Sequence, residues 1–388
     1  MIADRLISLI SKRRCTLLGV GPMSTNCVDA TIELANDFDV PLMLIASRRQ
    51  IDSEHFNGGY VNNWTTKLFS EYVFERDKKG KVFLARDHGG PWQSEIEQHE
   101  SMSLRKAMES CKLSFKSDID AGFQILHIDP SIDIHGHPSK DDILDRIFEL
   151  YEYCWSYAQR TGKEIIFEIG TEEQSGSTNS QEELNYTLIS INRFCDKNRL
   201  PRPTFVVVQT GTRVMEMRNV GSFDTPLRVM DELPAEIQVP NMVKVCNDNG
   251  VFMKEHNADY LSDDALYWHP CLGIHAANVA PEFGVAETKA FITCLESHGL
   301  NALSDEFLCL AYSSRKWEKW MIDGSNASDR DRALIAGHYV FSTSHFQELK
   351  HRAETALNEK NIHLNTFLKE ALKSSIYRYM LNFKLVAR

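Results

Sequence analysis

The chain lacks any long hydrophobic run, since no stretch approaches the roughly 18 apolar residues that a membrane-spanning helix needs. It also lacks an excess of positive charge: 54 acidic residues against 43 basic ones give a net charge of −11. Nucleic acids and anionic membranes bind basic surfaces, so we expect neither as a partner. The first 15 residues, MIADRLISLISKRRC, have no small-residue cleavage site, which argues against a signal peptide.

The nine cysteines lack the paired spacing of a redox or zinc motif, because no CxxC occurs. Their odd number and several apolar surroundings predict reduced, buried thiols and a cytoplasmic protein. A dinucleotide-binding loop is not predicted either, since GVGPMS after the first apolar run lacks the third glycine of GxGxxG.

The chain contains a repeated pattern in which a short apolar run is followed by a segment with helical periodicity. Runs of this kind suit parallel strands that are buried on both faces. Eight such units within about 300 residues predict a closed (β/α)8 barrel, a TIM barrel, rather than an open sheet. The later sequence is helical, so we expect a barrel domain over 1–305 and a C-terminal helical cap over 306–388. The predicted strands are 15–22, 40–47, 81–88, 122–129, 164–170, 204–210, 251–256 and 273–279.

Imidazoles and carboxylates gather at the predicted carboxyl ends of the strands, where barrel enzymes keep their catalytic groups. Each residue alone also fits a structural role: Asp129 could begin a turn, and a lone His88 is often structural. Their joint placement on five strands predicts a divalent metal site with neighbouring acid/base groups. The residues concerned are Asp87, His88, His127, Asp129, Glu168, Glu172, Glu173, Gln209, Glu255, His256, Asp259, His275 and Asn278.

An ordered set of motifs resembles the Z-subunit family of class II tagatose-bisphosphate aldolases. The motifs are NGGY (57–60), DHGGPW (87–92), GFQILHIDPS (122–131), IGTE (169–172), VVVQTG (206–211), EHNADY (255–260) and NVAPEFGVAET (278–288). The resemblance implies a TIM barrel of the class II aldolase type that acts in carbohydrate metabolism. Members are described as ketose-phosphate 4-epimerases or as partner subunits that stabilise a catalytic aldolase chain.

The chain departs from the family pattern at several positions that bear on the substrate. Ile45 stands where relatives carry a Glu, and Arg48 and Arg49 are gained nearby. His338 stands about where an Arg of the C-terminal block would fall. Catalytic aldolases use three His ligands, and the one expected on the sixth strand is absent here, with Gln209 nearby.

The resemblance and the strand-end pattern together give a site. His88 and His256 are the predicted metal ligands, with Asp129 or Glu172 as the carboxylate; zinc is the first expectation and manganese the second. Asp87, adjacent to a ligand, takes the proton-transfer role, and we expect the Gly89-Gly90 turn to let both neighbours reach one pocket. The remaining assignments are Glu172 and Asp259 as catalytic groups and Arg48, Arg49, Gln209, His275 and Asn278 as substrate-binding groups.

Two functions follow from these expectations. The first is a metal-dependent epimerase or aldolase that uses retro-aldol chemistry on a ketose phosphate or related acidic sugar. The alternative is a non-catalytic stabilising subunit that binds a class II aldolase chain. We also expect a homo-oligomer.

Overall fold

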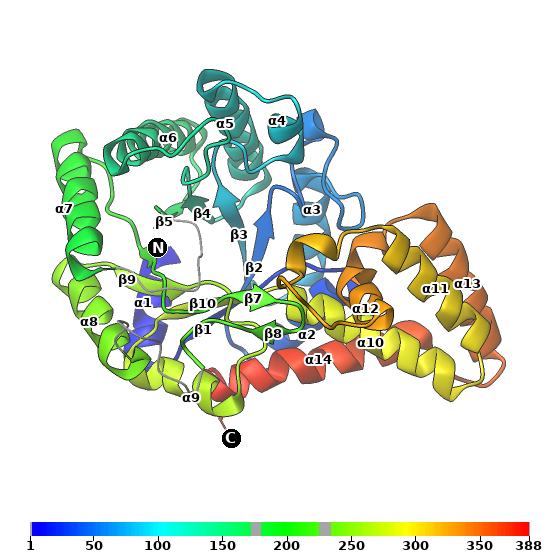
Figure 1. The fold of residues 1–388 in the computed structure, drawn as a ribbon. Helices are drawn as coiled ribbons and strands as arrows, with labels where there is room; N and C mark the ends of the chain where they lie inside the picture. Colours follow the sequence, from blue (N-terminus) through cyan, green and yellow to red (C-terminus); the bar gives the residue numbers. More distant parts are fainter. Residues whose placement is uncertain (1, 172–179, 225–233, 388) are drawn as a thin grey trace.

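A closed barrel of parallel strands forms the centre of the computed structural model, which describes residues 2–171, 180–224 and 234–387. Around the barrel the strands follow the order β1-β10-β9-β6-β5-β4-β3-β2 (Figure 1). Their bounds are β1 (Leu17–Val20), β2 (Leu42–Ser47), β3 (Val82–Gly89), β4 (Ile125–Ile128), β5 (Ile166–Ile169), β6 (Phe205–Val207), β9 (Phe252–Glu255) and β10 (Ala276–Val279). Each lies within a predicted strand or extends one residue past it, and the predicted (β/α)8 fold is confirmed. A small antiparallel hairpin, β7 (Val214–Met215) and β8 (Arg218–Asn219), was not predicted.

Helices alternate with the strands and surround the barrel. Many begin at a Ser or Thr whose side chain accepts a backbone N–H of the first turn, as at Ser24, Ser139 and Ser262. The helices of this layer are α2 (Thr25–Asp37), α3 (Thr66–Arg76), α4 (Glu95–His99), α5 (Leu104–Ala121), α6 (Lys140–Thr161), α7 (Gln181–Asn198), α8 (Ala235–Asp248), α9 (Asp263–Leu272) and α10 (Pro281–Ser297).

The amino ends of the strands are covered by α1 (Ile2–Arg13). Its Leu6 and Ile10 are buried in the barrel core, and Arg5 Nη2 donates to the carbonyl of Gly80, just before β3. With this end covered, the carboxyl ends of the strands form the face that is available for a site.

The C-terminal helices build an extension beside the barrel (Figure 1). Helices α10, α11 (Asn301–Ser313), α12 (Asp329–Val340) and α13 (Ser344–Asn358) pack around a second apolar cluster that includes Phe291, Phe307 and Phe346. The last helix, α14 (Leu364–Asn382), returns to the barrel and buries Leu372 and Ile376 in its core. The predicted helical extension is confirmed, while the domain boundary at 305/306 stays a prediction.

All nine cysteines lie in the described part of the chain and are unpaired, and seven of them are buried, as expected. None of the described helices has both the length and the apolar character needed to cross a bilayer.

Arg48 belongs to the buried framework of the barrel, which corrects its expected role in substrate binding. Its side chain is fully buried, with Nε 2.9 Å from Asp52 Oδ2 and Nη1 2.6 Å from Glu97 Oε1. Another Nη1 contact reaches the carbonyl of Gly90. The guanidinium is therefore committed to tying the loop after β2 to α4, and it cannot also bind a substrate anion.

The Arg48→Gln variant should unfold much more easily than the wild type, because it leaves two carboxylates buried beside a neutral amide. We expect a loss of about 3–5 kcal/mol in the free energy of unfolding, the usual cost of removing one partner of a buried ion pair. Denaturant unfolding measures this, with Arg49→Gln as the matched control that keeps wild-type stability. Wild-type stability of Arg48→Gln, with a raised KM, would restore the substrate-binding role.

Candidate metal centre

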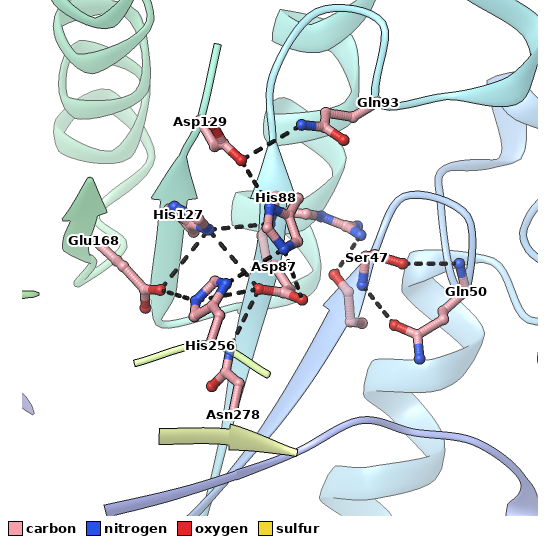
Figure 2. Close-up of polar contacts among 12 residues, drawn as sticks. Ser47, Gln50, Asp87, His88, Gln93, His127, Asp129, Glu168, His256 and Asn278 are labelled. Atoms are coloured by element: carbon pink, nitrogen blue, oxygen red, sulfur yellow. Dashed lines mark hydrogen bonds and ion pairs between the residues drawn. The ribbon is translucent and has the colours of Figure 1, made fainter. Parts of the chain in front are cut away.

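Three imidazoles converge at the carboxyl ends of β3, β4 and β9. His88 lies in β3, His127 lies in β4, and His256 directly follows β9 (Figure 2). One ring nitrogen from each lies within 4.8 Å of the others. The ring centroids are 4.9 to 5.3 Å apart. Neutral imidazole is a common ligand of zinc and related divalent ions, so this arrangement suits one.

The carboxylate of Asp87 lies among these three rings (Figure 2). Its Oδ2 is 3.8 Å from His88 Nε2, and its Oδ1 is 3.8 Å from both His127 Nδ1 and His256 Nε2. Asn278 Nδ2 donates to Asp87 Oδ1 at 3.2 Å, which joins β10 to the cluster. An acid/base group and three imidazoles thus share one volume at the mouth of the barrel.

The electrostatics of the cluster favour an ionised acid. Burial alone would raise the pKa of Asp87, but the charges of His88 and His256 outweigh it and hold that pKa well below its ordinary value. Burial would likewise lower the pKa of His88, yet Asp87 and Asp129 raise it to about 9. The pKa of His256 moves down, mainly through burial.

An irregularity in β3 brings neighbouring residues to the same pocket. The β3–β4 register shifts between Arg86 and Gly89, and His88 adopts a left-handed backbone with φ of +46°. Such a conformation is uncommon outside glycine and concentrates at functional sites. The expected role of the Gly-Gly turn is thereby corrected, because the bend is at His88 itself. The glycines permit close contact instead: a Cβ on Gly90 would lie 2.0 Å from the carbonyl oxygen of Asp129.

Two further carboxylates contact ring nitrogens of His88 and His256. Asp129 Oδ2 lies 2.7 Å from His88 Nδ1, and Ser131 Oγ donates to Asp129 Oδ1 at 2.6 Å. Glu168 Oε1 lies 3.0 Å from His256 Nε2. Carboxylates in this position orient ligand imidazoles in metal sites.

The group of imidazoles in the structure has one member more than predicted. His127 adds a third imidazole, while Asp129, predicted as a metal ligand, contacts Nδ1 of His88, and its ligand role stays a prediction. His127 Nδ1 accepts the backbone N–H of His88 at 3.1 Å, while its Nε2 is buried without a hydrogen-bond partner among the described residues. The strand-end pattern included His127, whereas the family resemblance implied a third imidazole on the sixth strand.

A buried lysine below the cluster was missed altogether. Lys254 Nζ donates to Glu168 Oε2 at 2.6 Å, and both side chains are 1% exposed. Burial would raise the pKa of Glu168, but Lys254 and His127 lower it to about 2. The sequence pattern could have indicated this lysine. Side chains alternate between the two faces of a strand, so Lys254 lies on the same face as His256, two residues further on.

Two predicted residues have other contacts: the catalytic role of Asp259 stays a prediction, and the substrate-binding role of His275 is corrected. Asp259 Oδ1 accepts the backbone N–H groups of Ala280 and Glu282 at 3.0 and 2.9 Å, so this carboxylate caps the start of α10. His275 precedes β10 at the amino end of the barrel, where its Nδ1 accepts the N–H of Met253. An amino-end residue cannot reach a substrate at the opposite mouth.

The other predicted residues are placed more simply. Asn278 belongs to the cluster, as described above. Gln209 is buried two residues beyond the end of β6, and its substrate role stays a prediction. Arg49 lies two residues beyond the end of β2, at the mouth. Glu172 lies outside the described residues.

Solved structures share this fold, although the sequence matches no protein-family model and no curated protein. A chain described as a probable tagatose 6 phosphate kinase, from Sinorhizobium meliloti 1021, aligns with a TM-score of 0.72 at 15% identity, covering 94% of this chain and 99% of that one. The YdjI aldolase from Escherichia coli K12 aligns over 90% of this chain and 96% of its own, at 11% identity and a TM-score of 0.47. Fructose-bisphosphate aldolase from Campylobacter jejuni aligns over 94% and 95%, at 12% identity and a TM-score of 0.49. The match to the Sinorhizobium chain confirms the whole-chain architecture that the sequence resemblance implied.

Each of the three imidazoles should be needed for metal binding. We expect the purified wild type to carry a stoichiometric divalent metal, and His88→Ala, His127→Ala and His256→Ala to lose it, because each removes one of three ligands. Elemental analysis measures this, and His275→Ala at the opposite end of the barrel is the control. Full metal content in His127→Ala would contradict its ligand role and would favour a carboxylate as the third metal ligand.

The metal-free protein should lose stability as the pH rises from about 6.5 to about 9. His88 has a folded pKa of about 9 against an ordinary 6.5, so its contribution is complete below pH 6.5 and is lost as the pH passes 9. Thermal unfolding of chelator-treated wild type and His88→Gln across this range isolates the effect. Identical pH dependence in the two proteins would contradict the assignment.

Proposed function

We propose that the protein is a metal-dependent carbohydrate enzyme that breaks and re-forms a carbon–carbon bond of a ketose phosphate or related acidic sugar. One observation carries this proposal: an ionised carboxylate, Asp87, lies within 3.8 Å of three imidazoles from separate strands at the open end of a barrel. Retro-aldol chemistry of the metal-dependent kind needs these two components side by side.

The residues present fit a divalent ion. His88, His127 and His256 supply three nitrogen donors, and Asp129 and Glu168 orient two of the rings. Such an ion, when bound, polarises the ketose carbonyl and the adjacent hydroxyl so that negative charge can develop there. Zinc suits three imidazoles best, and manganese is the second choice.

Asp87 carries the proton. As the C3–C4 bond breaks, the C4 hydroxyl gives its proton to the Asp87 carboxylate, and the electron pair of the bond moves toward the ketose carbonyl. The products are the enediolate of one fragment and an aldehyde. The carboxylate can reach a hydroxyl bound there, because it lies 3.8 Å from each of the three imidazoles. Asn278, which donates to Asp87, keeps the carboxylate in position.

The same steps allow epimerisation or cleavage. If the aldehyde stays bound, turns and is attacked on its other face, Asp87 returns the proton to the C4 oxygen and the C4 epimer forms. If the aldehyde leaves, the reaction is that of an aldolase. We propose the epimerase, in keeping with the family that the sequence resembles. The Sinorhizobium chain of the same fold is named for tagatose 6 phosphate, which is a ketose phosphate.

The proposal is tested by incubating the metal-loaded chain alone with ketose phosphates that differ at C4 and following both the C4 epimer and the triose products. Turnover by the chain alone supports a catalytic protein. A chain that is inactive alone but stabilises a class II aldolase subunit would instead support the stabilising-subunit alternative.

Asp87→Asn should keep the fold and the metal but lose about 100- to 10,000-fold in turnover, the usual range for removing a general acid/base. The loss should fall mainly on kcat, because the proton transfer occurs in the transition state. Melting temperature, metal content and kcat are measured on one preparation, with the exposed Asp39→Asn as the control. Wild-type turnover by a metal-loaded Asp87→Asn protein would remove Asp87 from the mechanism.

A further inference from the structure

A cluster of aromatic and basic side chains lies where the C-terminal extension meets the loop after β2. The Tyr60 ring lies 4.9 Å from that of Tyr339 and 6.2 Å from that of His338. Trp320 Nε1 donates to Tyr339 Oη at 3.2 Å. Tyr60 comes from the barrel loop, whereas the other three come from the extension, so the cluster exists only because the two parts meet.

Two cations in this cluster, Arg49 and Lys319, have no carboxylate partner within residues 2–171, 180–224 and 234–387. Among the described residues, no carboxylate oxygen lies within 4 Å of either the Arg49 or the Lys319 nitrogens, and Arg49 Nε is buried without any hydrogen-bond partner. Lys319 Nζ lies over the rings of Trp320 and Tyr339, 5.0 and 5.1 Å from their centroids. The neighbouring Arg48, in contrast, is paired with two carboxylates.

The electrostatics agree that negative charge is missing here. Burial, and after it the nearby charge of Arg49, lowers the pKa of Lys319 to about 8, although the charge of Glu95 acts in the opposite direction. His338 is 1% exposed, and both of its ring nitrogens lack partners among the described residues. Lys319 itself is exposed to solvent, so an anion can reach it.

The loop that carries Arg49 leaves the barrel beside β3, the strand of Asp87 and His88. Ser47, the last residue of β2, pairs in register with Asp87, so Arg49 begins the loop directly next to the acid (Figure 2 shows Ser47 and Gln50 there). The segment carrying Lys319 is fixed at two points, since Trp320 O accepts the N–H of Glu216 at 2.7 Å and Lys316 Nζ lies 3.6 Å from Glu95 Oε1. These contacts tie the extension to loops on both sides of the mouth.

We infer that Arg49 and Lys319 form the subsite for the terminal anionic group of the substrate. The inference rests on the proposed function for the identity of the rest of the substrate. Guanidinium and ammonium groups both suit a phosphate or carboxylate. The C-terminal extension thereby supplies a substrate-binding residue to a barrel whose chemistry lies at the ends of its strands.

The experiment measures binding of inorganic phosphate, and separately of acetate, to the metal-loaded protein by calorimetry. Wild type should bind at least one of these anions. Lys319→Met and Arg49→Gln should each weaken that binding by about 10- to 100-fold, the effect of losing one charge-assisted hydrogen bond. Lys384→Met, which removes a lysine that lies over the ring of Tyr267 outside this cluster, is the matched control and should bind as wild type does. Preference for phosphate over acetate identifies a sugar phosphate, and the reverse preference identifies a sugar acid.

Each outcome bears on one proposal at a time. Anion binding that Lys319→Met and Arg49→Gln abolish, in a protein without aldol or epimerase turnover, supports the subsite and removes the proposed function. Turnover with unchanged KM in both variants keeps the proposed function and overturns the subsite. Wild-type protein that binds neither anion also overturns the subsite. Asp87→Asn should still bind the anion, because its carboxylate belongs to the chemistry rather than to this subsite.

Discussion

The close placement of one carboxylate among three imidazoles is the interaction on which the site depends. Asp87 and His88 are adjacent in a strand, where neighbouring side chains point to opposite faces. A shifted register and a left-handed His88 overcome that constraint, and the contact of Gly90 with Asp129 holds β3 against β4 at the same point. Backbone strain of this kind persists because surrounding contacts over-determine it.

The charges around the pocket are arranged in layers. Next to the pocket are the imidazoles and Asp87. Behind them, Asp129 and Glu168 hold the rings, and Lys254 neutralises Glu168 in the barrel interior. Buried charges are costly unless they are paired. Glu168, which contacts an imidazole on one side, is therefore paired with Lys254 on the other. In contrast, no carboxylate in the described part of the chain pairs with Arg49 at the rim, and a ligand charge is the partner that we propose there.

The C-terminal extension contacts the barrel at several places. Its last helix, α14, packs back onto the barrel core, while the segment before α12 reaches loops that follow β3 and β6. In the extension, Lys319 lies over the ring of Tyr339, and that ring contacts Tyr60 in the loop after β2. The proposed anion subsite therefore draws on both parts of the chain.

The sequence by itself determined the barrel, since eight apolar runs with helical intervals leave few other arrangements, and it identified Asp87, His88, His256 and Asn278. These residues were found because strand ends are local features. Only the folded chain shows that Arg48 and Arg49, which are neighbours in sequence, have opposite surroundings, and that His127 joins His88 and His256 in one group of imidazoles. It also placed His275 at the wrong end of the barrel for catalysis. The physical reason is common to all of these cases: a side chain's role depends on which distant groups neutralise or orient it, and the periodicity of one strand carries no information about its partners on another.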